Sequence, residues 1–194
     1  MVTEWMFNSY TRFRAERIAN HLAQFLQAGE TILDCGCGSM QIARLLQEQC
    51  RVHAFGTDVI HLNHDNRRFC LSSGERLPYA SNTFDVVFMM FTLHHMTNPA
   101  DALIEGLRVS RRHVIVLEDV YETRFELRLL KALDWSGNIV ISKNMSFPFN
   151  FKTEDEWKAV FALLGARLIA VEIIRPVPWR PSRHRVFVLE KSTV

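Results

Sequence analysis

The sequence has no long apolar run and no targeting segment at its start. Its longest apolar stretch, residues 86–91, falls far short of the roughly 18 residues that a membrane-spanning helix requires. The first residues include Glu4 and Trp5, so the basic-then-apolar pattern of a signal peptide is missing. We therefore expect no membrane span and a cytoplasmic location.

Cysteine is scarce, and neither sign of charge is in large excess. The chain has four cysteines, and Cys35 and Cys37 flank a glycine too closely for a relaxed disulfide. A disulfide framework is therefore excluded, and a reducing compartment is expected. The net charge of +2 is too small to indicate a nucleic-acid groove, and the basic stretches 108–113 and 180–185 are interpreted as a helix end and a loop. We expect no nucleic-acid partner.

The residues that are present predict strands and helices in alternation. Hydrophobic residues make up 48% of the 194, which suits one globular domain. Ser39 and Asn98 are expected to cap helices, and Thr153 with Glu156 forms a capping box. Apolar spacing predicts helices over residues 10–26, 40–49, 98–109, 124–133 and 153–165. Strands are predicted at residues 31–35, 52–57, 67–71, 84–90, 113–117, 167–174 and 185–190.

This alternation predicts an α/β fold with a parallel sheet and right-handed crossovers. The last two strands have no helix between them, so they can pair only as an antiparallel hairpin. The expected architecture is a three-layer, doubly wound, mostly parallel sheet that ends in this hairpin. We expect a single domain over residues 1–194, with an aromatic-rich insert at about 121–151.

The segment 32–39 (Ile-Leu-Asp-Cys-Gly-Cys-Gly-Ser) carries the strongest chemical signal. Its glycines allow a sharp turn after a strand and a close approach to a ligand. Asp34, two residues before the first glycine, would repel a phosphate but suits a cationic ligand. Gln41 also occupies the place of the third glycine in the dinucleotide fingerprint. These features argue against an NAD-dependent oxidoreductase.

Asp58 ends the next predicted strand, about 20 residues beyond the glycines, where a carboxylate can accept hydrogen bonds from both hydroxyls of a ribose. The alternative interpretation is an aspartate that only stabilises a turn.

With these motifs in order, the sequence resembles the class I S-adenosylmethionine (SAM)-dependent methyltransferases, particularly the small-molecule group (type 11) that includes quinone-biosynthesis methyltransferases. The resemblance extends from about residue 12 to residue 190. It rests on residues 32–38, Asp58, 74–79 followed by 84–87, 93–95, and 107–109 with 114–117.

The resemblance implies that SAM is the cofactor and that its methyl group passes to a small-molecule acceptor. It also implies that Asp34, Gly36 and Gly38 contact the methionine end of SAM and that Asp58 contacts the ribose. By the same resemblance, Gly74 and Glu75 contact the adenine edge, and Phe91 lines the path to the sulfonium.

Three departures from the family pattern stand out. Met40 occupies the place of a third glycine, where it either crowds the cofactor or packs, and Ser73 replaces an aspartate that contacts the adenine amino group. The first two departures favour an alternative, a non-catalytic binding or scaffold protein with the SAM fold. Arg111-Arg112-His113 replaces a Lys-Pro-Gly-Gly turn, a change expected to stay within the loop.

Candidate catalytic residues follow the fourth and fifth predicted strands. His94 and His95 lie where open α/β sheets bind ligands, so one is a candidate general base; the alternative is that one packs and the other caps. Glu118, Asp119 and Tyr121 follow the fifth strand, where they either orient an acceptor or cap a helix.

The acceptor itself cannot be named from the sequence, nor can the atom that receives the methyl group or the oligomeric state. An aromatic-rich group in the insert suits a flat or apolar acceptor, or else forms the core of a small lid. Its members are Trp135, Asn138, Phe147, Phe149 and Phe151. Cys35 and Cys37 supply only two ligands, short of a closed metal site, so no metal is expected.

Overall fold

The computed structural model describes residues 2–62, 68–138, 148–178 and 182–191. The helices are α1 (Val2–Leu22), α2 (Gln41–Cys50), α3 (Pro99–Val109), α4 (Arg124–Asn138) and α5 (Glu154–Leu163), with 3₁₀ turns at Ala23–Phe25 and Leu93–His95. The strands are β1 (Thr31–Cys35), β2 (His53–Asp58), β3 (Phe69–Leu71), β4 (Phe84–Met90), β5 (Ser110–Val120), β6 (Ala166–Ile174) and β7 (Arg183–Lys191). None of the described helices is long and apolar enough to cross a membrane.

The strands form one seven-stranded sheet in the order β3-β2-β1-β4-β5-β7-β6. The pairs among β1 to β5 are parallel, whereas β7 runs antiparallel to both β5 and β6. The predicted fold class is therefore confirmed. The positions of β7 inside the sheet and β6 at its edge agree with their burial: residues 186–189 of β7 are continuously buried, while the interior of β6 alternates between half-buried and exposed residues.

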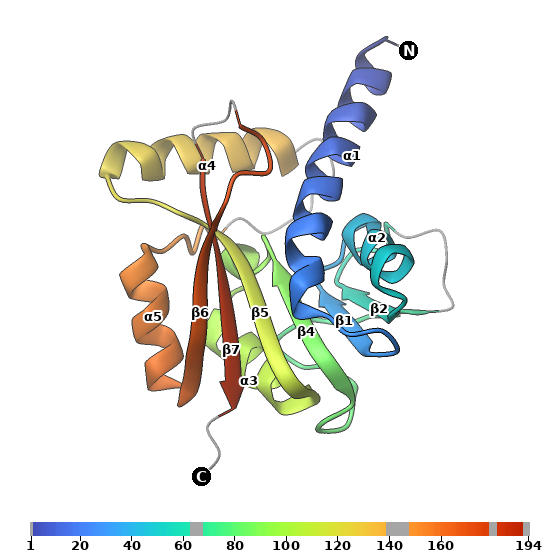
Figure 1. The fold of residues 1–194 in the computed structure, drawn as a ribbon. Helices are drawn as coiled ribbons and strands as arrows, with labels where there is room; N and C mark the ends of the chain where they lie inside the picture. The colour runs from blue at the N-terminus through green and yellow to red at the C-terminus, as the bar shows by residue number, and fades with distance from the viewer. Residues whose placement is uncertain (1, 63–67, 139–147, 179–181, 192–194) are drawn as a thin grey trace.

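Helices cover both faces of the sheet (Figure 1). On one face, Ile18 of α1 and Leu46 of α2 share a core cluster with Phe88 of β4; on the other, Leu103 of α3 and Trp157 of α5 belong to a second core cluster. The layers are thus helix, sheet and helix. In Figure 1, α4 lies across the end of the sheet where β5 finishes, which is the carboxyl end of the parallel strands.

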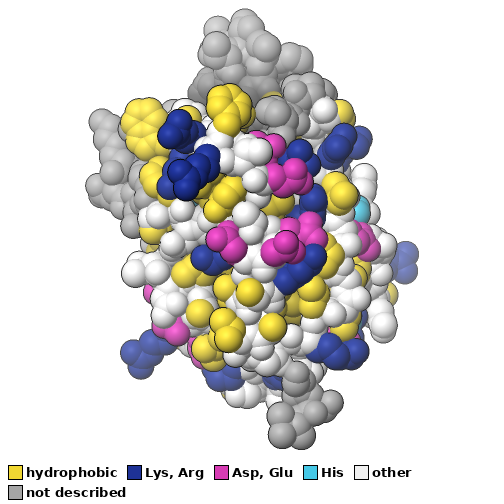
Figure 2. All heavy atoms as spheres, turned by 90° about the vertical axis from the view of Figure 1, so that its left-hand side faces the viewer, with side chains coloured by type: hydrophobic (Ala, Val, Ile, Leu, Met, Phe, Trp, Pro, Cys, Tyr) yellow, Lys and Arg dark blue, Asp and Glu magenta, His cyan; other side chains and the backbone are white. Residues whose placement is uncertain are grey.

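Acidic and basic side chains lie next to one another on the side of the molecule that carries α5 (Figure 2). Glu154, the first residue of α5, is 2.7 Å from the Lys158 amine and 2.5 Å from the Arg185 guanidinium. Charges of both signs are therefore paired on this side, in keeping with the small net charge.

One predicted helix cap is confirmed in full, one is confirmed in position only, and one is wrong. The Thr153 hydroxyl accepts a hydrogen bond from the Glu156 amide (3.1 Å), and the Glu156 carboxylate accepts one from the Thr153 amide (2.7 Å). Ser39 does not cap α2: the helix begins at Gln41, and Met40 occupies the cap position in a left-handed conformation (φ 59°). Asn98 occupies the cap position of α3 and Pro99 begins the helix, as predicted, but the Asn98 side chain donates to Asp101 (2.7 Å) instead of accepting from a backbone amide.

The expectation that residues 111–113 stay within a loop is also wrong, because β5 begins at Ser110. Arg111 lies 3.0 Å from Asp85, and Arg112 lies 2.7 Å from Glu30. Since both guanidinium groups find carboxylate partners on neighbouring segments, the strand can begin with charged residues.

Candidate functional site

The bend after β1 needs its first glycine for packing. Gly36 has a φ of +77°, and its amide donates to the Thr57 carbonyl (2.7 Å). A β-carbon at Gly36 would lie 2.0 Å from the Thr92 hydroxyl oxygen, so no side chain fits. At Gly38 (φ +50°), a β-carbon would meet nothing within 4 Å. The bend is therefore packed on one side and open on the other.

The open side faces a cavity of about 250 Å³. It is lined by the bend, by the end of β4 and by one side of α1, including Thr11, Arg14, Asp34, Gly36, Gly38 and Phe91. The Arg14 guanidinium lies 4.2 Å from the centre of the Phe91 ring, a cation–π contact that joins α1 to the end of β4. Thr11 and Arg14 were not predicted, since their only signal was the apolar spacing of a helix.

Asp34 is the charged residue at the bottom of this bend, and its side chain is only 2% exposed. Burial, and then repulsion by the Asp58 carboxylate, raise the pKa of Asp34 to about 7. Among the described residues, none donates a hydrogen bond to the Asp34 carboxylate or forms an ion pair with it. A buried carboxylate in this position favours a cationic ligand, because such a ligand would restore the lost solvation.

A second cavity, of about 210 Å³, adjoins the first, since Gly36 lines both. Asp58 borders it, and its two carboxylate oxygens accept hydrogen bonds from the Gly38 amide (2.8 Å) and the Ile60 amide (3.0 Å). The carboxylate thus stabilises the turn and also lies at a ligand-sized space. Both interpretations of Asp58 are therefore compatible with its position.

Ser73, Gly74 and Glu75 form the opposite wall of the second cavity. The Ser73 hydroxyl accepts from the Glu75 amide (3.2 Å). A β-carbon at Gly74 would lie 2.5 Å from the Met96 methyl carbon, so glycine is required here for close packing.

All seven predicted cofactor-binding residues line one or both of the two cavities. Met40 instead packs in the core: it is buried, and a β-carbon at Gly56 would lie 2.8 Å from its sulfur. Of the two alternatives for Met40, packing is therefore the one that the structure supports.

The candidate catalytic residues separate into different groups. His94 Nδ1 lies 2.6 Å from Glu118 Oε2, while Glu118 Oε1 accepts from the Thr92 and Leu93 amides (3.0 and 2.8 Å). Burial lowers the pKa of His94, but attraction to Glu118 and contacts with Asp134 outweigh it and raise the pKa to about 10. An imidazolium has no free lone pair, so His94 is poorly suited to act as a general base at neutral pH.

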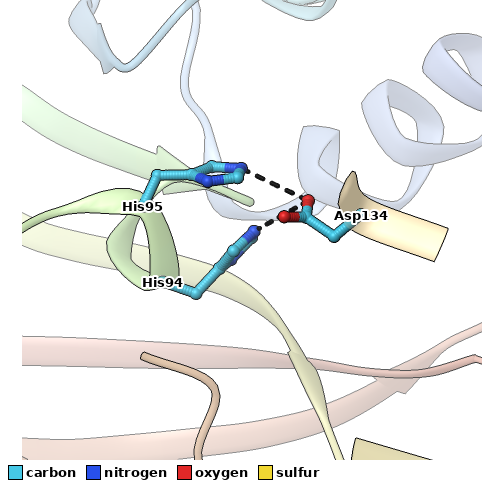
Figure 3. Close-up of side chains that lie close together, drawn as sticks. All are labelled: His94, His95 and Asp134. Atoms are coloured by element: carbon cyan, nitrogen blue, oxygen red, sulfur yellow. Dashed lines mark ion pairs between the residues drawn. The ribbon is translucent and has the colours of Figure 1, made fainter. Parts of the chain in front are cut away.

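His95 is the last residue of the same turn, its ring centroid is 4.1 Å from that of His94, and it lines the second cavity. His94 Nε2 and His95 Nε2 are each 3.4 Å from Asp134 Oδ1, and both imidazoles point toward this carboxylate (Figure 3). Burial raises the pKa of Asp134, but the two histidines outweigh it, and the pKa lies well below its usual value.

The residues that follow Glu118 point elsewhere, because successive side chains of a strand alternate between its faces. Asp119 lies 2.5 Å from His184 Nδ1, and the His184 ring packs edge-on to Phe91. The Tyr121 hydroxyl donates to Glu156 at the start of α5 (3.4 Å). Tyr121 therefore contacts α5 rather than the histidine pair.

Part of the aromatic group contributes to this region. Phe151 is buried and stacks on His94, with 4.4 Å between ring centroids, and Phe149 stacks on Phe151 at 6.5 Å. Trp135 is 51% exposed on α4, and Phe147 lies outside the described residues. At Phe151 the interpretation as a small core is therefore the better supported one.

Residues 33–117 match a family model described as a methyltransferase domain. A tRNA U34 carboxymethyltransferase of Shewanella halifaxensis is 27% identical over 214 residues, covering 99% of this chain and 61% of that protein. A ubiquinone/menaquinone biosynthesis C-methyltransferase, UbiE, of Cupriavidus necator is 33% identical over 87 residues, covering 41% of this chain and 36% of that protein. The chain thus spans less than two thirds of the length of these relatives.

Among solved structures, magnesium protoporphyrin IX methyltransferase (ChlM) from Synechocystis PCC 6803 with bound SAH has a TM-score of 0.65 at 14% identity, covering 95% of this chain and 84% of that chain. At this identity the likeness concerns the fold. Together with the sheet described above, these findings show the Rossmann-like methyltransferase fold, and residues 33–117 are similar to a methyltransferase domain.

Proposed function

We propose that this chain binds SAM along the two cavities and transfers its methyl group to a small-molecule acceptor. The observation that carries the proposal is the buried Asp34 carboxylate, which borders the first cavity without a donor among the described residues. The ammonium of the methionine end fits this carboxylate, and Arg14 in the same cavity offers a cation to the methionine carboxylate.

The second cavity suits the nucleoside end of the cofactor. Each Asp58 oxygen accepts one amide hydrogen bond, and a carboxylate oxygen has further acceptor capacity for the ribose hydroxyls. Glu75 and Gly74 border the place that would take the adenine. Because the cavities meet at Gly36, a single extended molecule can occupy both.

When bound, SAM would supply an electrophilic methyl group: the acceptor lone pair would form the new bond, the sulfur would keep the electrons of the old one, and the positive charge would pass to the acceptor, which releases a proton to solvent if it carries one. No new charge is created in this step, so the residues of the chain contribute mainly by alignment and by excluding water. Phe91 and Arg14 close one side of the first cavity through their cation–π contact. A strong general base is unnecessary when the acceptor is already nucleophilic.

Among the candidate catalytic residues, we propose His95 as the one that contacts the bound ligand, because it lines the second cavity. His94 and Glu118 are positioning residues in this proposal. Glu118 accepts hydrogen bonds from the Thr92 and Leu93 amides and contacts the His94 ring, and it thereby fixes the turn that carries His95.

Isotope-labelled SAM tests the acceptor class directly. We expect the label to appear in a low-molecular-weight extract incubated with the full chain, as the name of the UbiE relative suggests. Label in an RNA fraction instead would favour the chemistry named for the tRNA-modifying relative. Micromolar SAM binding with no transfer to either fraction would favour the non-catalytic alternative.

Asp58→Ala is expected to weaken SAM binding by at least about tenfold, since hydrogen bonds to a charged group contribute roughly 1.5–3 kcal/mol. Isothermal titration calorimetry measures the change. The matched control is Asp155→Ala, which removes an exposed carboxylate on α5. Thermal unfolding of both variants separates loss of the ribose contact from loss of the Gly38 hydrogen bond. Unchanged affinity in Asp58→Ala would contradict the ribose contact.

A further inference from the structure

We propose that His94, His95 and Asp134 bind a divalent transition-metal ion. The donor atoms are the Nε2 atoms of the two histidines and Oδ1 of Asp134, which point toward one another in Figure 3. One ligand atom from each residue lies within 4.8 Å of the other two. All three side chains are buried or half-buried, so the group is not a chance arrangement of solvated charges.

The distances from the two imidazoles to Asp134 also fit ligands of one metal ion. Both Nε2 atoms are 3.4 Å from Asp134 Oδ1, whereas charge-assisted hydrogen bonds are about 2.7–2.9 Å long. The same cluster contains such a short contact, 2.6 Å between His94 Nδ1 and Glu118. Metal–ligand bonds of about 2.1 Å in a tetrahedron place neighbouring ligand atoms about 3.4 Å apart. The spacing around Asp134 is therefore that of two ligands sharing an ion.

The residues around His94 also hold its ring in an orientation that suits a metal ligand. Metal-bound histidines commonly donate their second nitrogen to a carboxylate, which fixes the ring and its tautomer. Glu118 is in this position at His94 Nδ1, and it is itself held by two backbone amides. Phe151 stacks on the His94 ring and restricts its rotation. His94 Nε2 is thereby directed toward Asp134, and an ion bound there would displace the Nε2 proton of the imidazolium.

Two imidazole nitrogens and one carboxylate oxygen favour Zn²⁺ or Fe²⁺ over Mg²⁺ or Ca²⁺. Three protein ligands leave at least one coordination position open, as in catalytic rather than structural metal sites. His95 borders the second cavity, so a donor atom of a ligand there could reach the open position. The ion would also join α4 to the turn after β4.

This inference departs from the sequence-based expectation of no metal, which rested on Cys35 and Cys37. It does not depend on methyl transfer, because metal binding is measured on the protein without SAM. Asp34→Asn distinguishes the metal proposal from the proposed SAM binding, because this variant is expected to lose SAM affinity and to keep the metal affinity of the wild type.

The test uses the full chain, freed of any purification tag and stripped with a chelator. Zn²⁺ is titrated in competition with a chromophoric chelator, and Co²⁺ is added separately to record visible absorption. We expect one equivalent of each metal to bind. His95→Gln and Asp134→Asn should each weaken Zn²⁺ binding by more than roughly 100-fold, since loss of an outer partner alone costs 10- to 100-fold.

His53→Gln is the matched control, because His53 is exposed at the start of β2, and its Zn²⁺ affinity should equal that of the wild type. Two variants are used so that a folding defect in one, detected by circular dichroism, leaves the other informative. Absence of stoichiometric Zn²⁺ binding by the folded wild type would overturn the proposal. So would wild-type affinity in folded His95→Gln or Asp134→Asn.

Discussion

Asp34→Asn is expected to bind SAM roughly 10- to 100-fold more weakly than the wild type and, without ligand, to be more stable above pH 7. Affinity falls because a neutral amide cannot balance the ammonium of the cofactor. Stability rises because the variant no longer buries a carboxylate that lacks a donor among the described residues. Calorimetry gives the affinity, and urea unfolding at several pH values gives the stability.

The direction of the pH dependence follows from the pKa of Asp34, which burial raises from 3.8 to about 7. Between these values the folded protein keeps a proton that the unfolded chain releases, so the free energy of unfolding contributed by this group decreases as pH rises from about 4 to about 7. Above pH 7 the loss is complete. The stability gain of Asp34→Asn should therefore be absent near pH 4 and largest above pH 7.

Cofactor binding should show the opposite trend. Only the ionised Asp34 attracts the ammonium, so wild-type SAM affinity should rise with pH up to about 7 and then level off. In Asp34→Asn this rise should disappear. A SAM affinity that is equal in the two proteins across this range would exclude Asp34 as the ammonium contact.

Asp85→Asn is a control in which the stability is expected to change in the opposite direction. The Asp85 carboxylate accepts from the Thr31 amide and hydroxyl (both 2.8 Å) and pairs with Arg111. Burial raises the pKa of Asp85, but these contacts outweigh it and the net shift is downward, so its contribution to stability is present at neutral pH and lost on acidification. Asp85→Asn should therefore be less stable than the wild type at pH 7, with unchanged SAM affinity.

The strands and the glycine bend could be predicted because their signals are local. β1 and β4 have the predicted bounds, since continuous apolar runs end at a glycine or a polar turn. The Ser39 cap was wrong because the backbone turns through a left-handed Met40, a conformation that the sequence does not specify for a non-glycine residue. The Arg111–His113 segment extends β5 because its charges are paired by carboxylates distant in sequence.

The cofactor side of the site could be predicted because its motifs lie at strand ends and resemble those of a known family. Asp34 and Asp58 lie within the last two residues of a parallel strand, Phe91 follows one, and the carboxyl ends of such strands meet at one edge. Arg14 and Asp134 lie on helices, and no local pattern fixes how α1 and α4 rest on that edge. Their contacts with Phe91 and with the histidine pair depend on tertiary packing, so they could be found only in the structure.

Gly36→Ala is expected to destabilise the protein by about 3 kcal/mol or more, a large fraction of the roughly 5–15 kcal/mol typical of a domain. Two costs add. A left-handed conformation costs a non-glycine residue about 1–2 kcal/mol, and overpacking costs about 1–3 kcal/mol more. The second cost arises because the new β-carbon would lie 2.0 Å from the Thr92 hydroxyl oxygen and 2.6 Å from the Thr92 β-carbon.

Gly29→Ala measures the cost of the left-handed conformation alone, because Gly29 has a φ of +87° and a β-carbon there meets nothing within 4 Å. Urea unfolding should therefore place Gly29→Ala about 1–2 kcal/mol below the wild type and Gly36→Ala well below both. Equal unfolding midpoints for the two variants would mean that Thr92 yields to the added methyl group. In that case the bend is held by backbone conformation alone, and close packing against the end of β4 does not fix the shape of the cofactor site.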